Sequence, residues 1–232
     1  MSIAQNIARL EEELQGTGCR LVAVSKTKPV EKILEAYQAG QRLFGENKAQ
    51  EMAAKFEELP QDIEWHMIGH LQRNKVKYIA PFVQLIQSVD SLRLLEEIEK
   101  QALHFDRTID CLLQFYLAEE ESKFGLTWEE ARDLLESDTF KAMEKVRITG
   151  VMGVATNTDK AEQLKKEFRQ LRHYFQQVKE TYFPEEDSFK EISMGMSADY
   201  PLALAEGSTL IRVGSSIFGA REYGQGGEGE KR

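Results

Sequence analysis

This chain has little cysteine, no net positive charge and no long apolar run. Only two cysteines, Cys19 and Cys111, occur in 232 residues, and their spacing matches neither a metal-ligand motif nor a disulfide framework. We therefore expect a cytoplasmic location, where thiols stay reduced. No apolar run is long enough to cross a membrane. Residues 1–5 have neither the charged start nor the apolar stretch of a secretory signal.

The formal net charge is −9, which argues against nucleic acid as a partner, because a nucleic-acid surface needs a basic patch. A small anion is still compatible with this charge, since backbone N–H groups can hold it locally. The interior has no Gly/Pro/Ser-rich linker and no internal repeat, so we expect one domain over residues 1–223. The polar, glycine-rich residues 224–232 are expected to form a disordered tail.

Apolar, β-rich runs alternate with amphipathic helical stretches along the chain. A helix is predicted over residues 3–14, and strands are predicted at 20–26, 43–46, 65–68, 85–88, 109–117, 148–155, 192–196 and 210–218. Alternating strands and helices favour a parallel sheet. A chain of this length with eight βα units fits an α/β fold of the closed (β/α)8, TIM-barrel type. A doubly wound open sheet of fewer strands is the alternative, because two of the predicted strands are short.

Lys26 is the residue most indicative of chemistry. It ends the first predicted strand, in the stretch VSKTK (24–28). Burial at the mouth of a sheet lowers the pKa of a lysine, and an uncharged lysine amine forms Schiff bases with carbonyl compounds. The alternative is a solvated loop lysine ahead of a helix, which is the commoner use of lysine at such a position.

The seventh predicted strand ends in small residues. Ser193, Gly195 and Ser197 alternate with methionines, so a period of two puts them on one face, where they would leave a cavity. The exit SAD (197–199) precedes a helix whose unpaired N–H groups would point toward an anion. The alternative is an ordinary helix cap with a tightly packed glycine.

The eighth predicted strand contains Arg212 between two apolar residues. A buried guanidinium without an acceptor is costly, so Arg212 needs either an internal carboxylate or the ring nitrogen of a cofactor. Gly214, Ser215 and Ser216 then interrupt the apolar run. A glycine followed by hydroxyl groups allows a phosphate to approach backbone N–H groups closely, and a β-bulge or barrel bend is the alternative.

Two phosphate-type loops therefore follow the seventh and eighth strands, where (β/α)8 barrels commonly hold phosphate. Together with the strand-end lysine they predict pyridoxal phosphate as cofactor. A phosphosugar Schiff-base aldolase is the competing interpretation. Asn47, after the second predicted strand, could reach the same site. No third ligand joins His66 and His70 in a zinc set, so we expect no metal and an interior histidine at position 66.

Segments along almost the whole chain resemble the pyridoxal-phosphate homeostasis protein family. They are AVSKTKP (23–29), LFGENKAQE (43–51), WHMIGHLQRNK (65–75), ESKFG (121–125), GVMGVAT (150–156), SMGMSADYPLA (193–203) and GSTLIRVGSSIFGAR (207–221). This family has a barrel related to the N-terminal domain of alanine racemase, and it binds pyridoxal 5'-phosphate. The resemblance implies that fold and that cofactor here.

The resemblance also implies roles for individual residues. Lys26 would be the aldimine lysine, and Arg212 would face the pyridine nitrogen. Asn47 and Ser193 would line the ring, and the phosphate would be held by Ser197, Gly214 and Ser215. Two positions depart from the pattern of many members: Tyr116 stands in place of an asparagine, and Phe124 replaces a small residue. Both are expected to reshape the mouth of the site.

The function implied by the resemblance is intracellular homeostasis of the cofactor, by storage, buffering or delivery, without established turnover. We expect PLP-dependent apo-enzymes as partners, no membrane partner, and a monomer, because there is no length for the second β domain of alanine racemases. An arginine against the ring nitrogen keeps that nitrogen unprotonated, which disfavours carbanion chemistry. The alternatives are an amino-acid racemase-like enzyme and a regulator that binds a partner through residues 73–77.

Overall fold

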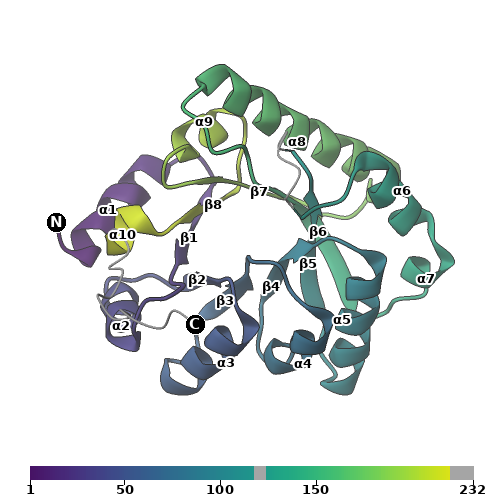
Figure 1. The fold of residues 1–232 in the computed structure, drawn as a ribbon, viewed down its shortest axis with the longest axis horizontal. Helices are drawn as coiled ribbons and strands as arrows, with labels where there is room; N and C mark the ends of the chain where they lie inside the picture. The colour runs from purple at the N-terminus through teal and green to yellow at the C-terminus, as the bar shows by residue number, and fades with distance from the viewer. Residues whose placement is uncertain (118–123, 220–232) are drawn as a thin grey trace, which may run out of the picture.

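The strands of this protein close into a parallel barrel. The structure, a computed structural model, describes residues 1–117 and 124–219. Each strand pairs with the next in chain order, and the last pairs with the first (Figure 1). The strands are β1 (Arg20–Val24), β2 (Leu43–Glu46), β3 (Glu64–Met67), β4 (Leu85–Val89), β5 (Ile109–Phe115), β6 (Val146–Gly153), β7 (Glu191–Met196) and β8 (Leu210–Val213). The predicted TIM-type barrel is confirmed, and the open-sheet alternative is wrong.

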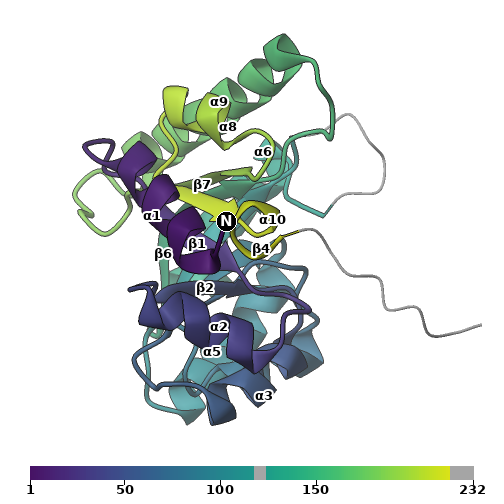
Figure 2. The ribbon, with the colours of Figure 1, turned by 90° about the vertical axis from the view of Figure 1, so that its left-hand side faces the viewer.

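Helices surround the barrel and lie outside its strands (Figures 1 and 2). They are α1 (Ile3–Leu14), α2 (Val30–Gln38), α3 (Ala49–Glu58), the 3-10 helix η1 (Arg73–Lys75), α4 (Val76–Ile79), α5 (Leu92–His104), α6 (Trp128–Glu136), α7 (Asp138–Lys141), α8 (Ala161–Tyr182), α9 (Tyr200–Ala205) and α10 (Ser215–Phe218). No helix among the described residues is both long and apolar enough to cross a bilayer.

Helix α1 covers the barrel where β8 pairs with β1. Ser2 caps the helix, and its apolar residues recur every three or four positions and are buried: Ile3, Ile7, Leu10 and Leu14. The helix lies beside α10 (Figures 1 and 2), and the side-chain amide of Asn6 donates to the carbonyl of Ile217 at 2.9 Å. Because α10 is a single helical turn, α1 supplies the apolar cover near β8 and β1.

The strands separate two apolar regions, as the period of two requires. One region lies between the strands and the helices and contains most of the buried apolar side chains. The other is a smaller cluster, formed by Val22, Leu85, Leu112, Met152 and Leu210. These five residues come from five strands, so we place their cluster inside the barrel.

Most predicted strand ends differ from the observed ones, and two of these errors bear on the candidate site. The first strand ends at Val24, so Lys26 lies in the following turn rather than in the strand. The eighth strand ends at Val213, because Gly214 leaves the extended conformation (φ −123°, ψ −65°) and the amides of Ile217 and Phe218 bond to its carbonyl. Residues 215–218 are thus a helical turn. An apolar run alone does not distinguish a strand from a short buried helix.

The predicted tail, residues 224–232, lies outside the described residues. The domain boundary at residue 223 therefore stays a prediction.

Candidate functional site

The exits of β7, β8 and β1 meet at the carboxyl end of the barrel. Lys26 is half-buried in the turn after β1, and Ser197 directly follows β7. Gly214, the first residue after β8, donates its N–H to Ser197 Oγ at 3.2 Å. A Cβ atom added to Gly214 would lie 3.1 Å from the carbonyl oxygen of Val24, so only a glycine fits there without displacement. The lysine loop and the two predicted phosphate loops are therefore adjacent.

Asn47 and Ser215 complete this group. Asn47 is half-buried directly after β2, which pairs with β1, and Ser215 is exposed at the start of α10. A Cβ atom on Gly69 would lie 2.6 Å from the Asn47 carbonyl oxygen, so the exit of β3 packs closely on this backbone. The structure thus places five predicted site residues on neighbouring strand exits. We call them the rim site: Lys26, Asn47, Ser197, Gly214 and Ser215.

Arg212 lies on β8, two residues before Gly214, and only 4% of it is exposed. Its Nη1 donates to Ser193 Oγ at 2.5 Å, and its Nη2 donates to the Gly153 carbonyl at 2.8 Å. Burial lowers the pKa of Arg212 to about 10, an effect that the negative charge of Asp199 opposes. The guanidinium therefore keeps its charge at neutral pH, and its hydrogen-bond acceptors are neutral oxygens rather than a carboxylate.

A chain of hydrogen bonds continues from Arg212 across the barrel interior. The Ser193 hydroxyl donates to Gln87 Oε1 at 2.6 Å, and Gln87 Nε2 lies 2.9 Å from His66 Nδ1. With the Gln87 amide as donor, Nδ1 of His66 is an acceptor and the imidazole is neutral. Burial lowers the pKa of His66 to about 3. The prediction of a satisfied interior histidine is confirmed.

Gly195 does not share the inner face predicted for it. It has a φ of +91°, and a Cβ atom there would lie 2.6 Å from the Cβ of Ala203 on α9. The glycine allows α9 to pack tightly on β7, as the alternative interpretation of this exit proposed. Asp199 occupies the N-cap position of α9, but its Oδ1 accepts the N–H of Met196 at 2.5 Å instead of capping the helix.

The two departures from the family pattern border one cavity of about 210 Å³ at this end of the barrel. Tyr116 follows β5, and Phe124 stacks on His70 with ring centroids 3.8 Å apart. His70 in turn bonds to Asp90, with Nδ1 and Oδ2 separated by 3.0 Å. Both aromatic residues therefore line a cavity at the carboxyl end of the barrel, and their effect on the mouth of the rim site stays a prediction. Residues 121–123 of the ESKFG element lie outside the described residues.

Sequence reasoning missed Gln87, which links His66 to Ser193. Its signal is an amide in the middle of the buried strand LIQSV (85–89).

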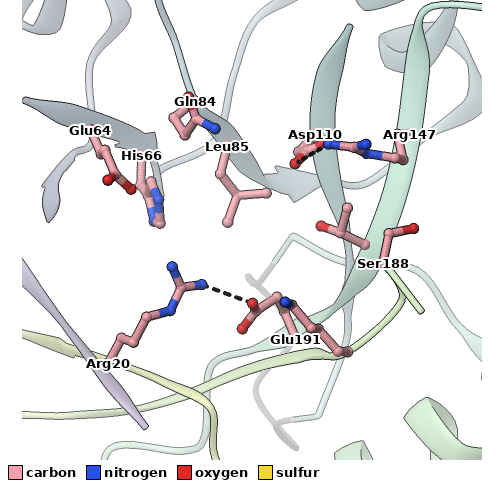
Figure 3. A pocket seen from close by; sticks show the side chains of 11 residues that line it. Arg20, Glu64, His66, Gln84, Leu85, Asp110, Arg147, Ser188 and Glu191 are labelled. Atoms are coloured by element: carbon pink, nitrogen blue, oxygen red, sulfur yellow. Dashed lines mark hydrogen bonds and ion pairs between the residues drawn. The ribbon is translucent and has the colours of Figure 1, made fainter. Parts of the chain in front are cut away.

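Sequence reasoning also missed a pocket of about 200 Å³ at the opposite, amino end of the barrel (Figure 3). Four of the charged residues there form two ion pairs, since Arg20 bonds to Glu191 and Arg147 bonds to Asp110.

This second pocket is not the candidate site. Its lining comes mainly from the first residues of strands, whereas active residues of such barrels lie after the carboxyl ends. Paired charges near the first residues of several strands indicate that polar side chains close the amino end of the barrel. The rim site therefore carries the functional argument.

Comparison with known proteins first defines the class. Residues 1–222 match the family model of the alanine racemase N-terminal domain. The barrel also superimposes on alanine racemase from Bartonella henselae with a TM-score of 0.69, over 94% of this chain and 58% of that chain. At 17% identity this second match shows the fold alone.

Relatives of closer similarity define the family. The pyridoxal phosphate homeostasis protein of Pasteurella multocida is 34% identical over 96% of this chain and 99% of that protein. Its counterpart in Aquifex aeolicus is 35% identical over 96% of this chain and 100% of that protein. PipY of Synechococcus elongatus without PLP matches with 38% identity and a TM-score of 0.87 over 94% of this chain and 100% of PipY, and with PLP bound the TM-score is 0.84. The chain belongs to the pyridoxal phosphate homeostasis protein family.

Proposed function

We propose that this protein binds pyridoxal 5'-phosphate for intracellular homeostasis of the cofactor, by storing, buffering or delivering it, without catalytic turnover. In this proposal the cofactor is attached to Lys26 as a Schiff base. The observation that carries the proposal is the contact between Gly214 and both Ser197 and the β1 exit, which brings the lysine loop and two phosphate-type loops together. The names of the relatives and the PLP-bound structure of PipY support it.

The residues of the rim site fit the chemistry of this cofactor. When bound, it supplies an aldehyde that condenses with a primary amine and releases water. Lys26 would provide the amine. Ser197 and Ser215 would provide hydroxyl groups for the phosphate, and the missing side chain of Gly214 allows a ligand to approach the backbone there.

Arg212 fits the ring nitrogen. A guanidinium has more N–H groups than its two hydrogen bonds to Ser193 and Gly153 use, so others would be available to a ligand. An always-charged donor keeps a pyridine nitrogen unprotonated, which weakens the ring as an electron sink. Asn47 and Ser193 would line the ring, with Ser193 also fixing Arg212 from below.

Substitution of the lysine tests this function. Purified protein mixed with pyridoxal 5'-phosphate should show the absorption band of a Schiff base, and borohydride should fix the adduct on the Lys26 peptide, as read by mass spectrometry. Lys26→Ala should lose the band. Lys28→Ala is the matched control, because Lys28 lies on the same loop but bonds to the carbonyls of Phe218 and Gly219. An adduct on another lysine, or none at all, would overturn the proposal.

An amino-acid racemase-like enzyme on the same site is the second candidate. The match to the alanine racemase N-terminal domain favours it, and the position of Arg212 beside the proposed ring disfavours it. Deuterium exchange at the α-carbon of a panel of amino acids distinguishes the two. Exchange above that of free cofactor would assign the site to an enzyme.

We also infer a monomer in the cytoplasm, with PLP-dependent apo-enzymes as recipients of the cofactor. Sedimentation of the loaded protein tests the monomer. Activation of an apo-enzyme by the loaded protein, at a rate above that of spontaneous cofactor release, tests direct delivery. A rate equal to spontaneous release would leave storage and buffering as the function.

A further inference from the structure

A buried cluster on β2 and α3 holds the loop that contains Lys26. At its centre, Lys55 Nζ donates to the Ser25 carbonyl at 2.9 Å, to Glu46 Oε1 at 2.8 Å and to Glu51 Oε1 at 2.7 Å. These bonds account for every N–H of an ammonium group. One of them ends on the backbone of the residue directly before Lys26.

The residue directly after Lys26 is held by the same cluster. Glu51 Oε1 accepts the backbone N–H of Thr27 at 2.6 Å. Thr27 has a φ of +62°, in the left-handed region that residues with a β-branched side chain rarely adopt. The hydrogen bond to Glu51 therefore helps to keep the backbone after Lys26 in an unfavourable conformation.

The side chain of Ser25 is also fixed. Its hydroxyl donates to Glu46 Oε1 at 2.6 Å. Glu46 is fully buried, Lys55 is 8% exposed and Glu51 is 23% exposed by side chain. Burial raises the pKa of Glu46, and the neighbouring ammonium of Lys55 opposes this shift. Solvent therefore weakens these charge-assisted bonds far less than those of a surface ion pair.

We propose that Lys55 and Glu51 are positioning residues for Lys26. They hold the backbone on both sides of this lysine, so that its amine meets the aldehyde of a pyridine-aldehyde phosphate in one orientation. The inference rests on the proposed function and deepens it. The lysine Nζ would attack the aldehyde carbon, a C=N bond would form and one water would leave, so no further reactant is needed. Loss of the cluster should impair this attachment more than it impairs non-covalent binding.

Lys55→Met tests the inference, because methionine fills similar volume without donors. Wild type and variant are mixed with pyridoxal 5'-phosphate, and the rate of borohydride-trapped attachment to Lys26 is measured. We expect attachment about 10- to 100-fold slower in the variant, since a small misplacement of a reacting group costs this much. Affinity for pyridoxine 5'-phosphate, which has no aldehyde, should change by less than about threefold on the same reasoning.

Amide hydrogen exchange of residues 25–28, measured without added cofactor, provides an independent reading. It should be faster in Lys55→Met than in wild type, because the Ser25 carbonyl and the Glu51 carboxylate lose their common donor. Lys55→Arg should recover part of the attachment rate. Lys100→Met is the matched control. Lys100 pairs with Glu97 on the surface and its side chain is 73% exposed, so its removal should change neither the attachment rate nor the amide exchange.

The outcomes separate the inference from the proposed function. Attachment at the wild-type rate in Lys55→Met would overturn the positioning role and leave the proposed function standing. So would a loss of affinity for pyridoxine 5'-phosphate as large as the loss of attachment rate. Absence of attachment to Lys26 in wild type would overturn both. If Lys55→Met does not fold, Glu51→Gln replaces it, because this half-buried change weakens the same bonds, and the same outcomes apply.

Discussion

Arg212 carries a full charge inside the barrel and is held there by neutral oxygens. Two of its N–H groups bond to the Ser193 hydroxyl and the Gly153 carbonyl. Such an arrangement keeps the guanidinium in one place without neutralising it, which leaves its charge available to a ligand at the rim site. The orientation of Arg212 depends on Ser193, whose own hydrogen is directed at Gln87.

Ser193→Ala should therefore destabilise the fold at the residue level. The change removes the donor to Gln87 Oε1 and an acceptor of Arg212, and both partners are buried. A buried polar group left without its partner costs about 1–3 kcal/mol. We expect the free energy of unfolding, measured by urea titration, to fall by about this amount.

Ser188→Ala is the control for this measurement. Ser188 is half-buried near the amino end of the barrel and has no hydrogen bond from its side chain among the described residues. Its removal should change the free energy of unfolding by less than about 0.5 kcal/mol. Equal effects of the two substitutions would contradict the role assigned to Ser193.

At the scale of elements, the contact between β7 and α9 depends on the absence of a side chain at Gly195. Gly195→Ala would place a Cβ atom 2.6 Å from that of Ala203 and would force alanine into a φ of +91°. Together, overpacking and the left-handed backbone cost about 2–5 kcal/mol. We expect this loss in the free energy of unfolding, measured by urea titration.

The double variant Gly195→Ala/Ala203→Gly identifies the source of this loss. Removing the Cβ of Ala203 relieves the contact but leaves the backbone strain, so the two changes should not be additive. The double variant should be more stable than the sum of the single effects by about 0.5–3 kcal/mol, the range for residues in contact. Strict additivity would show that the helix does not limit the space at Gly195.

The order of elements could be predicted from the sequence, because apolar periodicity reports burial. Helix α1 begins and ends where predicted, and β2 does as well. The helical turn at residues 215–218 was missed because its apolar residues also fit a buried strand, and its identity depends on the backbone at Gly214. The local pattern of apolar residues does not specify the backbone conformation of Gly214.

The candidate site was predictable in part for a related reason. Rim residues follow strand ends, so their positions follow from the topology of a parallel barrel. Lys55 was not predictable in this way, because it lies on a helix outside the barrel and only tertiary packing brings it to the Ser25 carbonyl. Gln87 and His66 lie on different strands, and their contact depends on register.

At the scale of the whole molecule, His66 connects the two ends of the barrel interior. It lines the pocket at the amino end (Figure 3) and bonds to Gln87, which leads to Ser193 and Arg212 toward the rim. An ionised imidazole at this position would lose the bond to Gln87 and would be buried without a carboxylate partner among the described residues. The folded state therefore favours a neutral His66.

The stability of the protein should consequently fall as the pH is lowered through the unfolded pKa of histidine. In the folded protein the pKa of His66 is lowered to about 3, whereas an unfolded histidine titrates near about 6.5. Between these values only the unfolded state gains the proton, so acid favours unfolding. From about pH 7.5 to about pH 5 this one residue should lower the free energy of unfolding by about 2 kcal/mol.

Urea titrations across this pH range measure the effect. His66→Gln should lose the corresponding part of the pH dependence, because glutamine does not titrate there, while the carboxylates contribute equally in every protein compared. His104→Gln is the control: His104 is exposed at the end of α5, and its removal should leave the pH dependence at the wild-type value. A wild-type pH dependence in His66→Gln would mean that the buried imidazole gains its proton without unfolding. The hydrogen-bond chain from His66 to Arg212 would then tolerate a second positive charge.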